Sequence, residues 1–155
     1  MKKITLTCAH AIVKYLIAQK ILINGKKEPL FPGVFGIFGH GNVACLGQAL
    51  EENQKELPTY RGHHEQNMAL TGIGYARAKR RQQIFVATSS VGPGATNMVT
   101  AAAVAMSNRL PILFLPGDTY AIECQILYCN KLNILIIQEI RQMMLLNLSQ
   151  DILIE

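Results

Sequence analysis

The 155-residue chain lacks any stretch that is long and apolar enough to span a lipid bilayer. Only 16% of its residues are charged and half are hydrophobic, which argues against intrinsic disorder. The cysteines show neither the spacing of a zinc site nor the density of a secreted disulfide scaffold. They are Cys8, Cys45, Cys124 and Cys129. We therefore expect one cytoplasmic domain with reduced thiols, no membrane partner and enough chain to bury a core.

Aromatic side chains are absent from the one basic run of the sequence. The net charge is +5, but the basic residues are scattered apart from the run Lys79-Arg80-Arg81. Nucleic-acid-binding patches combine clustered basic residues with a recognisable motif or interleaved aromatic residues. We therefore interpret this run as the solvated end of a helix and expect no nucleic-acid partner.

Glycine and proline are absent from residue 119 onward, although the chain contains twelve glycines and six prolines before that point. Residues 122–155 also lack alanine and valine and are dominated by isoleucine and leucine. The runs ILII and MMLL within them do not keep a helical period. The composition therefore predicts a change in the character of the chain close to residue 121.

Short apolar runs alternate with helical patterns over the first 118 residues. The predicted strands are 33–39, 57–62, 84–90 and 111–118, and the predicted helices include 5–20, the segment that GHGN opens, 65–80, and the segment after Gly-Pro-Gly. The strand runs are too uniformly apolar for a sheet with one wet face. The pattern predicts an α/β domain of three layers, in which helices cover both faces of a parallel sheet.

Three polar segments follow predicted strands and are candidates for a ligand site. They are GHGN (39–42), RGHHEQ (61–66) and SSVGPGATN (89–97). In a parallel α/β sheet, ligands bind outside the carboxyl ends of the strands. We therefore expect these three segments to gather at one edge of the sheet.

Familiar motifs account poorly for these segments. A dinucleotide fingerprint would need glycine at Ala44, and SSVGPG does not form a nucleophile elbow. His63 and His64 are adjacent, do not share a helix face and have no third ligand at a useful spacing, so we expect no metal site. Glu65 has two open interpretations: a first-turn acid that suits the helix dipole, or a cofactor contact.

The segments GIFGHGN, HHEQNMA, ATSSVGPGATNMVTAAA and PILFLPGD resemble the N-terminal, pyrimidine-binding domain of thiamine-diphosphate enzymes related to acetolactate synthase. The resemblance covers residues 1–121 almost continuously. FGHGNV, TSSVGPGA and LPGD favour a member that hydrolyses a C–C bond in myo-inositol catabolism and opens a trihydroxylated cyclic dione to 5-deoxy-D-glucuronate. Another acetolactate synthase-like enzyme, or a non-catalytic partner-binding α/β domain, is the alternative.

The resemblance implies a role for each candidate site residue. Glu65 would hydrogen-bond N1′ of the aminopyrimidine of thiamine diphosphate and exchange a proton there, which makes it the catalytic residue. Pro93 and Asn97 would line the pyrimidine pocket, and Gly39 and His40 would lie near the reacting centre. The family's active site lies between two subunits, so the parent is expected to be at least a homodimer that binds a small cyclic dione.

The resemblance also implies what this chain does not supply. In the family a separate C-terminal domain holds the diphosphate and its Mg²⁺ through a Gly-Asp-Gly…Asn motif. Gly117-Asp118-Thr119 lacks the second glycine of that motif. We therefore expect a fragment with half of a site and little or no activity alone.

Residues 122–155 are predicted to be translated out of frame. With third bases chosen freely, the shifted frame of IECQILYCNKLNIL can spell NRMPDPVLQQIEHS, which resembles the family's continuation. Residues 1–121 would then form an incomplete domain, whose strand at 111–116 presents an unpaired edge. The alternative is that the tail is a divergent amphipathic helix.

Overall fold

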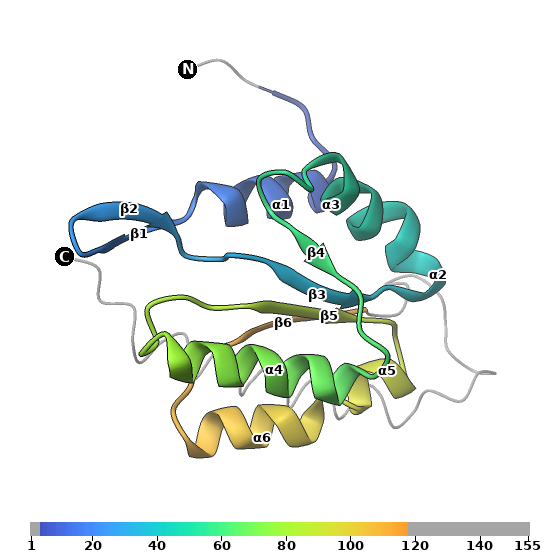
Figure 1. The fold of residues 1–155 in the computed structure, drawn as a ribbon. Coiled ribbons are helices and arrows are strands. Elements are labelled where there is room, and N and C mark those ends of the chain that lie inside the picture. The colour runs from blue at the N-terminus through green and yellow to red at the C-terminus, as the bar shows by residue number, and fades with distance from the viewer. Residues whose placement is uncertain (1–3, 118–155) are drawn as a thin grey trace.

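The computed structural model describes residues 4–117, so the predicted tail 122–155 lies outside the described residues. Four parallel strands form a sheet in the order β4-β3-β5-β6 (Figure 1). The strands are β3 (Val34–Ile37), β4 (Thr59–Tyr60), β5 (Val86–Ser89) and β6 (Leu113–Pro116). All four coincide with predicted strands, and within residues 4–117 β6 pairs with β5 alone.

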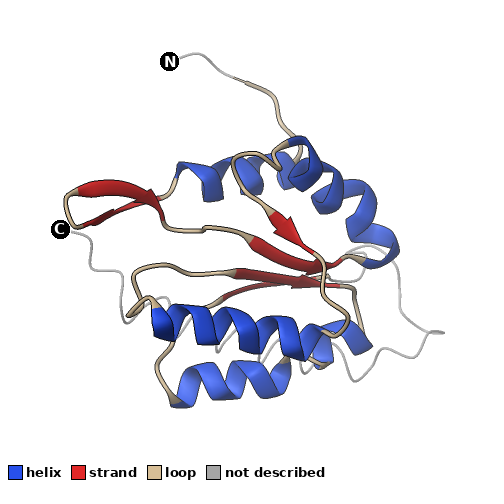
Figure 2. Ribbon diagram, in the orientation of Figure 1, coloured by secondary structure: helices blue, strands red, loops and turns tan. Residues whose placement is uncertain are grey.

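Helices cover both faces of this sheet, as Figure 2 shows. On one side lie α1 (Cys8–Ala18) and the helical stretch formed by α2 (Gly39–Asn42), the π-helix η1 (Val43–Gly47) and α3 (Gln48–Glu52). On the other side lie α4 (Glu65–Ala78), α5 (Pro93–Thr96) and α6 (Val99–Ser107). The predicted three-layer α/β fold is therefore confirmed.

Two hydrophobic cores lie on opposite faces of the sheet, and β5 contributes to both. Val86 belongs to the core with α1 and α3, whereas the next residue, Ala87, belongs to the core with α4 and α6. Successive side chains of a strand point to opposite faces, so a strand covered on both sides is buried at every position. All four residues of β5 are buried. Its two polar residues make hydrogen bonds, because the hydroxyl of Thr88 donates to the carbonyl of Leu115 at 2.7 Å and that of Ser89 donates to the carbonyl of Ser90 at 3.1 Å.

A hairpin that the sequence analysis did not predict precedes β3. The strands β1 (Lys20–Ile23) and β2 (Lys26–Pro29) pair antiparallel, with Asn24 and Gly25 between them. Both turn residues have positive φ, 51° and 78°, which is the geometry of the two-residue turns that suit a twisted hairpin. The Asn-Gly pair therefore specifies a hairpin turn.

The alanines of α6 pack within this chain. Small side chains let another helix approach closely, and α4 is that helix. Ala101, Ala102 and Ala105 are buried in the core that α4 and α6 share, while Ala103 is exposed. Their small volume lets α6 lie close to α4.

The two glycines of α4 have different surroundings. A Cβ at Gly72 would lie 3.1 Å from atoms of both Phe85 and Ile112, whereas a Cβ at Gly74 would meet nothing within 4 Å. Glycine inside a helix costs roughly 0.5–1 kcal/mol relative to alanine. Only Gly72 is therefore required by packing.

We expect Gly74→Ala to raise the free energy of unfolding by about 0.5–1 kcal/mol, because it adds helix propensity without a clash. Gly72→Ala, two residues away on the same helix, is the matched variant. It should lose that gain or become destabilising, because Phe85 and Ile112 must move to admit the new methyl group. Urea unfolding of both variants tests this, and equal gains at the two positions would contradict it.

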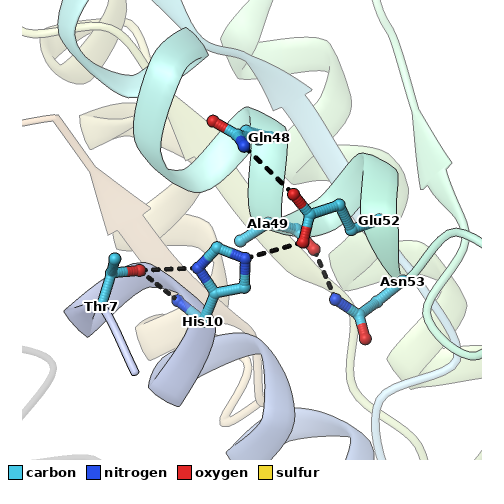
Figure 3. A network of polar contacts seen from close by, with 6 residues as sticks. All are labelled: Thr7, His10, Gln48, Ala49, Glu52 and Asn53. Carbon is cyan, nitrogen blue, oxygen red and sulfur yellow. Dashed lines mark hydrogen bonds and ion pairs between the residues drawn. The ribbon is translucent and has the colours of Figure 1, made fainter. Parts of the chain in front are cut away.

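A polar network joins the start of α1 to the end of α3 (Figure 3). The Thr7 side chain accepts a hydrogen bond from the backbone N–H of His10, and its hydroxyl lies 2.7 Å from His10 Nδ1. His10 Nε2 lies 2.9 Å from Glu52 Oε2, and Gln48 donates to the other carboxylate oxygen at 3.1 Å. Glu52 is half exposed, so this network makes a modest contribution to stability.

The hydrogen bond from His10, followed by that from Gln48, holds the pKa of the Glu52 carboxyl below its ordinary value of 4.5. A carboxyl whose pKa is lowered by folding stabilises the protein above its unfolded pKa, and this contribution disappears as the pH falls through the folded pKa. We therefore expect Glu52→Gln to destabilise the protein at neutral pH and to lose that effect as the pH falls below about 4.5. Urea midpoints of both proteins across this range measure it, and a difference independent of pH would contradict it.

Candidate functional site

The carboxyl ends of the four parallel strands lie at one edge of the sheet, and the three polar segments follow three of them. GHGN forms α2 directly after β3, RGHHEQ connects β4 to α4, and SSVGPGATN runs from β5 into α5. The predicted gathering of these segments follows from the parallel order of the strands.

Glu65 and Asn97 are in direct contact, although 32 residues separate them in the sequence. Glu65 is the first residue of α4 and is half-buried, while Asn97 caps the end of α5. The Asn97 side-chain amide donates a hydrogen bond to Glu65 Oε2 at 3.0 Å. The carboxylate therefore leans across from α4 toward α5, and no described residue forms an ion pair with it.

Gly94 gives the second oxygen of this carboxylate its space. A Cβ at Gly94 would lie 3.0 Å from Glu65 Oε1 and would collide with Ser90 Oγ. Gly94 itself is buried. The Gly-Pro-Gly turn thus brings backbone, rather than a side chain, against the carboxylate.

Ser90 is also packed against Gly39 at the end of β3. Gly39 has a φ of +66°, and a Cβ there would lie 2.5 Å from Ser90 Cβ. The Ser90 side chain therefore occupies the space that two glycines leave, Gly39 on one side and Gly94 on the other. This packing connects the segment after β3 to the carboxylate of Glu65.

An open cleft of about 300 Å³ lies beside this packing. Its lining residues come from the ends of β3, β5 and β6: Phe38, Gly39, His40, Gly41, Asn42, Ser90, Val91 and Gly117. The buried carbonyl of Ser89 ties two lining residues together, because it accepts hydrogen bonds from Asn42 Nδ2 at 3.2 Å and from the Gly117 N–H at 2.8 Å. His40, Asn42 and Ser90 are the lining residues with polar side chains.

The structure brings the predicted site residues together in two adjoining groups. Glu65 and Asn97 form one, and Gly39 and His40 line the cleft in the other. Pro93 is the exposed first residue of α5, a position to which its fixed φ is suited.

Ser90 and Asn42 have roles that the sequence did not indicate. The Ser90 side chain fills the space that Gly39 and Gly94 leave, and Asn42 donates a hydrogen bond to the carbonyl of Ser89. The sequence does contain one indication for Asn42, because it has an amide side chain shortly after a predicted strand. For Ser90 no local pattern exists, because its role depends on two distant glycines.

The histidines of RGHHEQ are exposed, and within residues 4–117 no group of three His, Cys, Asp or Glu side chains is placed to hold a metal. His64 is the extended residue before α4, but its side chain makes no capping hydrogen bond. In the described part of the chain, no helix has the length and apolar character that crossing a membrane requires.

The sheet, and the acid–amide pair at its carboxyl edge, define an α/β domain with a candidate ligand site at the strand ends. The chain belongs to the thiamine pyrophosphate enzyme family: the sequence profile of the family's N-terminal TPP-binding domain matches residues 29–143. This membership confirms the family resemblance inferred from the sequence motifs, and with it the cofactor class.

Curated relatives carry a more specific name. The chain is 54% identical over 121 residues to the 3D-(3,5/4)-trihydroxycyclohexane-1,2-dione hydrolase of Geobacillus thermodenitrificans. It is 50% identical to the proteins of that name from Clostridium tetani, over 121 residues, and Listeria innocua, over 120 residues. These matches cover 77–78% of this chain but 19% of each relative, so the chain spans about a fifth of their length.

Proposed function

We propose that this chain supplies the pyrimidine-binding half of the active site of a thiamine-diphosphate-dependent hydrolase that opens 3D-(3,5/4)-trihydroxycyclohexane-1,2-dione. The observation that carries the proposal is the Glu65 carboxylate, half-buried at the start of α4, with one oxygen bonded to Asn97 and the other beside Gly94. The names of the curated relatives supply the substrate.

The residues around Glu65 fit an aminopyrimidine. A carboxylate is a hydrogen-bond acceptor when ionised and a donor when protonated, so it can hold a ring nitrogen and exchange a proton with it. Gly94, which has no Cβ, leaves room for Glu65 Oε1 beside the Ser90 side chain, so the carboxylate can keep the position from which it would meet the ring. When bound, thiamine diphosphate supplies the electron sink that C–C bond cleavage requires.

Each predicted residue has a role in this proposal. Glu65 would hold N1′ of the aminopyrimidine and move a proton there, while Pro93 and Asn97 would border the ring. Gly39 and His40 lie in the cleft, which would receive the reacting part of the dione. A hydroxylated ring suits a cleft whose polar groups include an imidazole, an amide and a hydroxyl.

The remaining features of the parent belong to the same proposal. The diphosphate and Mg²⁺ would be held by another domain, and the site would be completed by a second subunit, in a cytoplasmic homo-oligomer without nucleic-acid or membrane partners. Residues 122–155 would lie outside the domain as an out-of-frame tail. The family profile nevertheless extends to residue 143, so the boundary at residue 121 stays a prediction.

A chimera tests the proposed function. Residues 1–121 of this chain replace the segment of the Geobacillus relative that they match, and the purified chimera is assayed for ring opening of the dione with thiamine diphosphate and Mg²⁺. We expect turnover at a rate comparable to the relative's, and little or none from this chain alone. A folded chimera that binds the cofactor but leaves the dione intact would contradict the substrate, and one that does not bind the cofactor would contradict the site.

A further inference from the structure

We propose that Asn97 is a positioning residue that determines which oxygen of Glu65 exchanges the proton. The resemblance alone makes Asn97 a lining residue of the cofactor pocket. The geometry points to a different task, because its amide is already engaged with Glu65 Oε2 at 3.0 Å. The proton exchange itself rests on the proposed function, whereas the contact between the two side chains does not.

The backbone of Asn97 is held firmly enough for this task. Its N–H donates to the carbonyl of Pro93 at 2.9 Å, and the next residue, Met98, is 2% exposed. Asn97 is the C-cap residue of α5 through its backbone N–H, whereas its side-chain amide donates to Glu65 on α4. The side chain is therefore not needed for the cap.

An amide is suited to orient a carboxylate without changing its chemistry. The Nδ2 group donates a hydrogen bond and brings no net charge, so Glu65 keeps its capacity to accept and release a proton. With Oε2 occupied, Oε1 remains, and among the described residues it has no hydrogen-bond donor. Gly94 leaves that oxygen its space, since a Cβ there would lie 3.0 Å from it.

Asn97 and Gly94 therefore act on the two oxygens of one carboxylate. Asn97 holds Oε2 by donating a hydrogen bond, and Gly94 leaves room for Oε1 because it has no Cβ, which would lie 3.0 Å from that oxygen. A hydrogen bond to a charged group is among the stronger ones in proteins, so Oε2 stays occupied and Oε1 is the oxygen left to meet a ring nitrogen.

NMR of the full 155-residue chain tests the positioning role without any turnover. In Glu65→Ala we expect the side-chain amide protons of Asn97 to shift upfield and to exchange faster with water. Glu65→Gln keeps an acceptor of the same shape without the charge, so it should give a smaller shift. Asn53 is the matched control: its amide donates to the backbone carbonyl of Ala49 at 2.7 Å and should not respond. An Asn97 amide that is unchanged in Glu65→Ala overturns the proposal.

Gly94→Ala gives the second test, because its methyl group would press on Oε1. We expect Gly94→Ala to shift the NMR signals of the Asn97 side-chain amide in the wild-type background. In the Glu65→Ala background the same substitution should shift them much less. An effect of equal size in both backgrounds would mean that the change passes through α5 instead, and would overturn the proposal. Adding thiamine to the wild-type chain separates the positioning role from the proposed function. If Glu65→Ala shifts the NMR signals of the Asn97 amide, but the NMR signal of the Glu65 side chain does not change when thiamine is added, the positioning role is supported and the proposed function is contradicted.

Discussion

Replacing Glu65 with glutamine is expected to lower kcat for ring opening by the chimera by about 10²–10⁴-fold. The side-chain amide of glutamine can still accept a hydrogen bond from Asn97, so the geometry at the start of α4 should survive. It cannot exchange a proton at neutral pH, and proton transfer by a positioned side chain contributes a factor of this size. Steady-state rates at saturating thiamine diphosphate, Mg²⁺ and dione measure the loss.

The alternative interpretation of Glu65 predicts a different result. A first-turn acid that only complements the helix dipole is worth roughly 0.3–1 kcal/mol of stability and nothing in rate. Glu51→Gln is a control for the loss of one negative charge, because Glu51 is an exposed acid of α3 outside the site, and it should keep full turnover. A Glu65→Gln protein that loses a little stability and retains full turnover would leave Glu65 a structural residue and remove the basis of the proposed mechanism.

Most of the sheet could be predicted because its signals are local. β3 lies within GVFGIFG and β5 within IFVATSS. Each segment begins with a short apolar run and ends at glycine or serine, which is the local signal of a strand that is buried on both faces. The parallel arrangement followed from the alternation of strands and helices. These features need no knowledge of which side chains finally touch.

Features set by contacts between distant segments could not be predicted. Gly72 and Gly74 look alike in the sequence, and only the positions of Phe85 and Ile112 distinguish them. The π-helix η1 (Val43–Gly47) interrupts a segment that was predicted to be one helix. Single π-helical turns inside α-helices are frequent at functional sites, and η1 directly follows α2, which lines the cleft.

The site was predictable at the level of which segments meet, but not at the level of atoms. Parallel strands bring their carboxyl ends together, so the gathering of Glu65 and Asn97 followed from topology. The particular hydrogen bond between them did not, and neither did the place of Ser90 between two glycines. Such contacts depend on how deeply each turn packs against its neighbours.

Gly39→Ala is expected to lower the free energy of unfolding by roughly 2–4 kcal/mol. Gly39 has a φ of +66°, a conformation that costs a residue with a side chain about 1–2 kcal/mol. The new Cβ would also lie 2.5 Å from Ser90 Cβ and 3.3 Å from its Cα, so the neighbouring backbone must shift as well. Urea unfolding of the full chain measures the combined cost.

Gly41→Ala separates this cost from a general effect of substitution in the cleft. Gly41 lines the same cleft and belongs to the same short helix, but a Cβ there would meet nothing within 4 Å and no positive φ is involved. It should leave stability unchanged or raise it slightly. Gly39→Asn tolerates the left-handed backbone better than alanine but keeps the contact with Ser90, so it should recover only the backbone part of the loss. A full recovery would mean that Ser90 has room to move, and that the packing between Gly39 and Gly94 does not hold the site together.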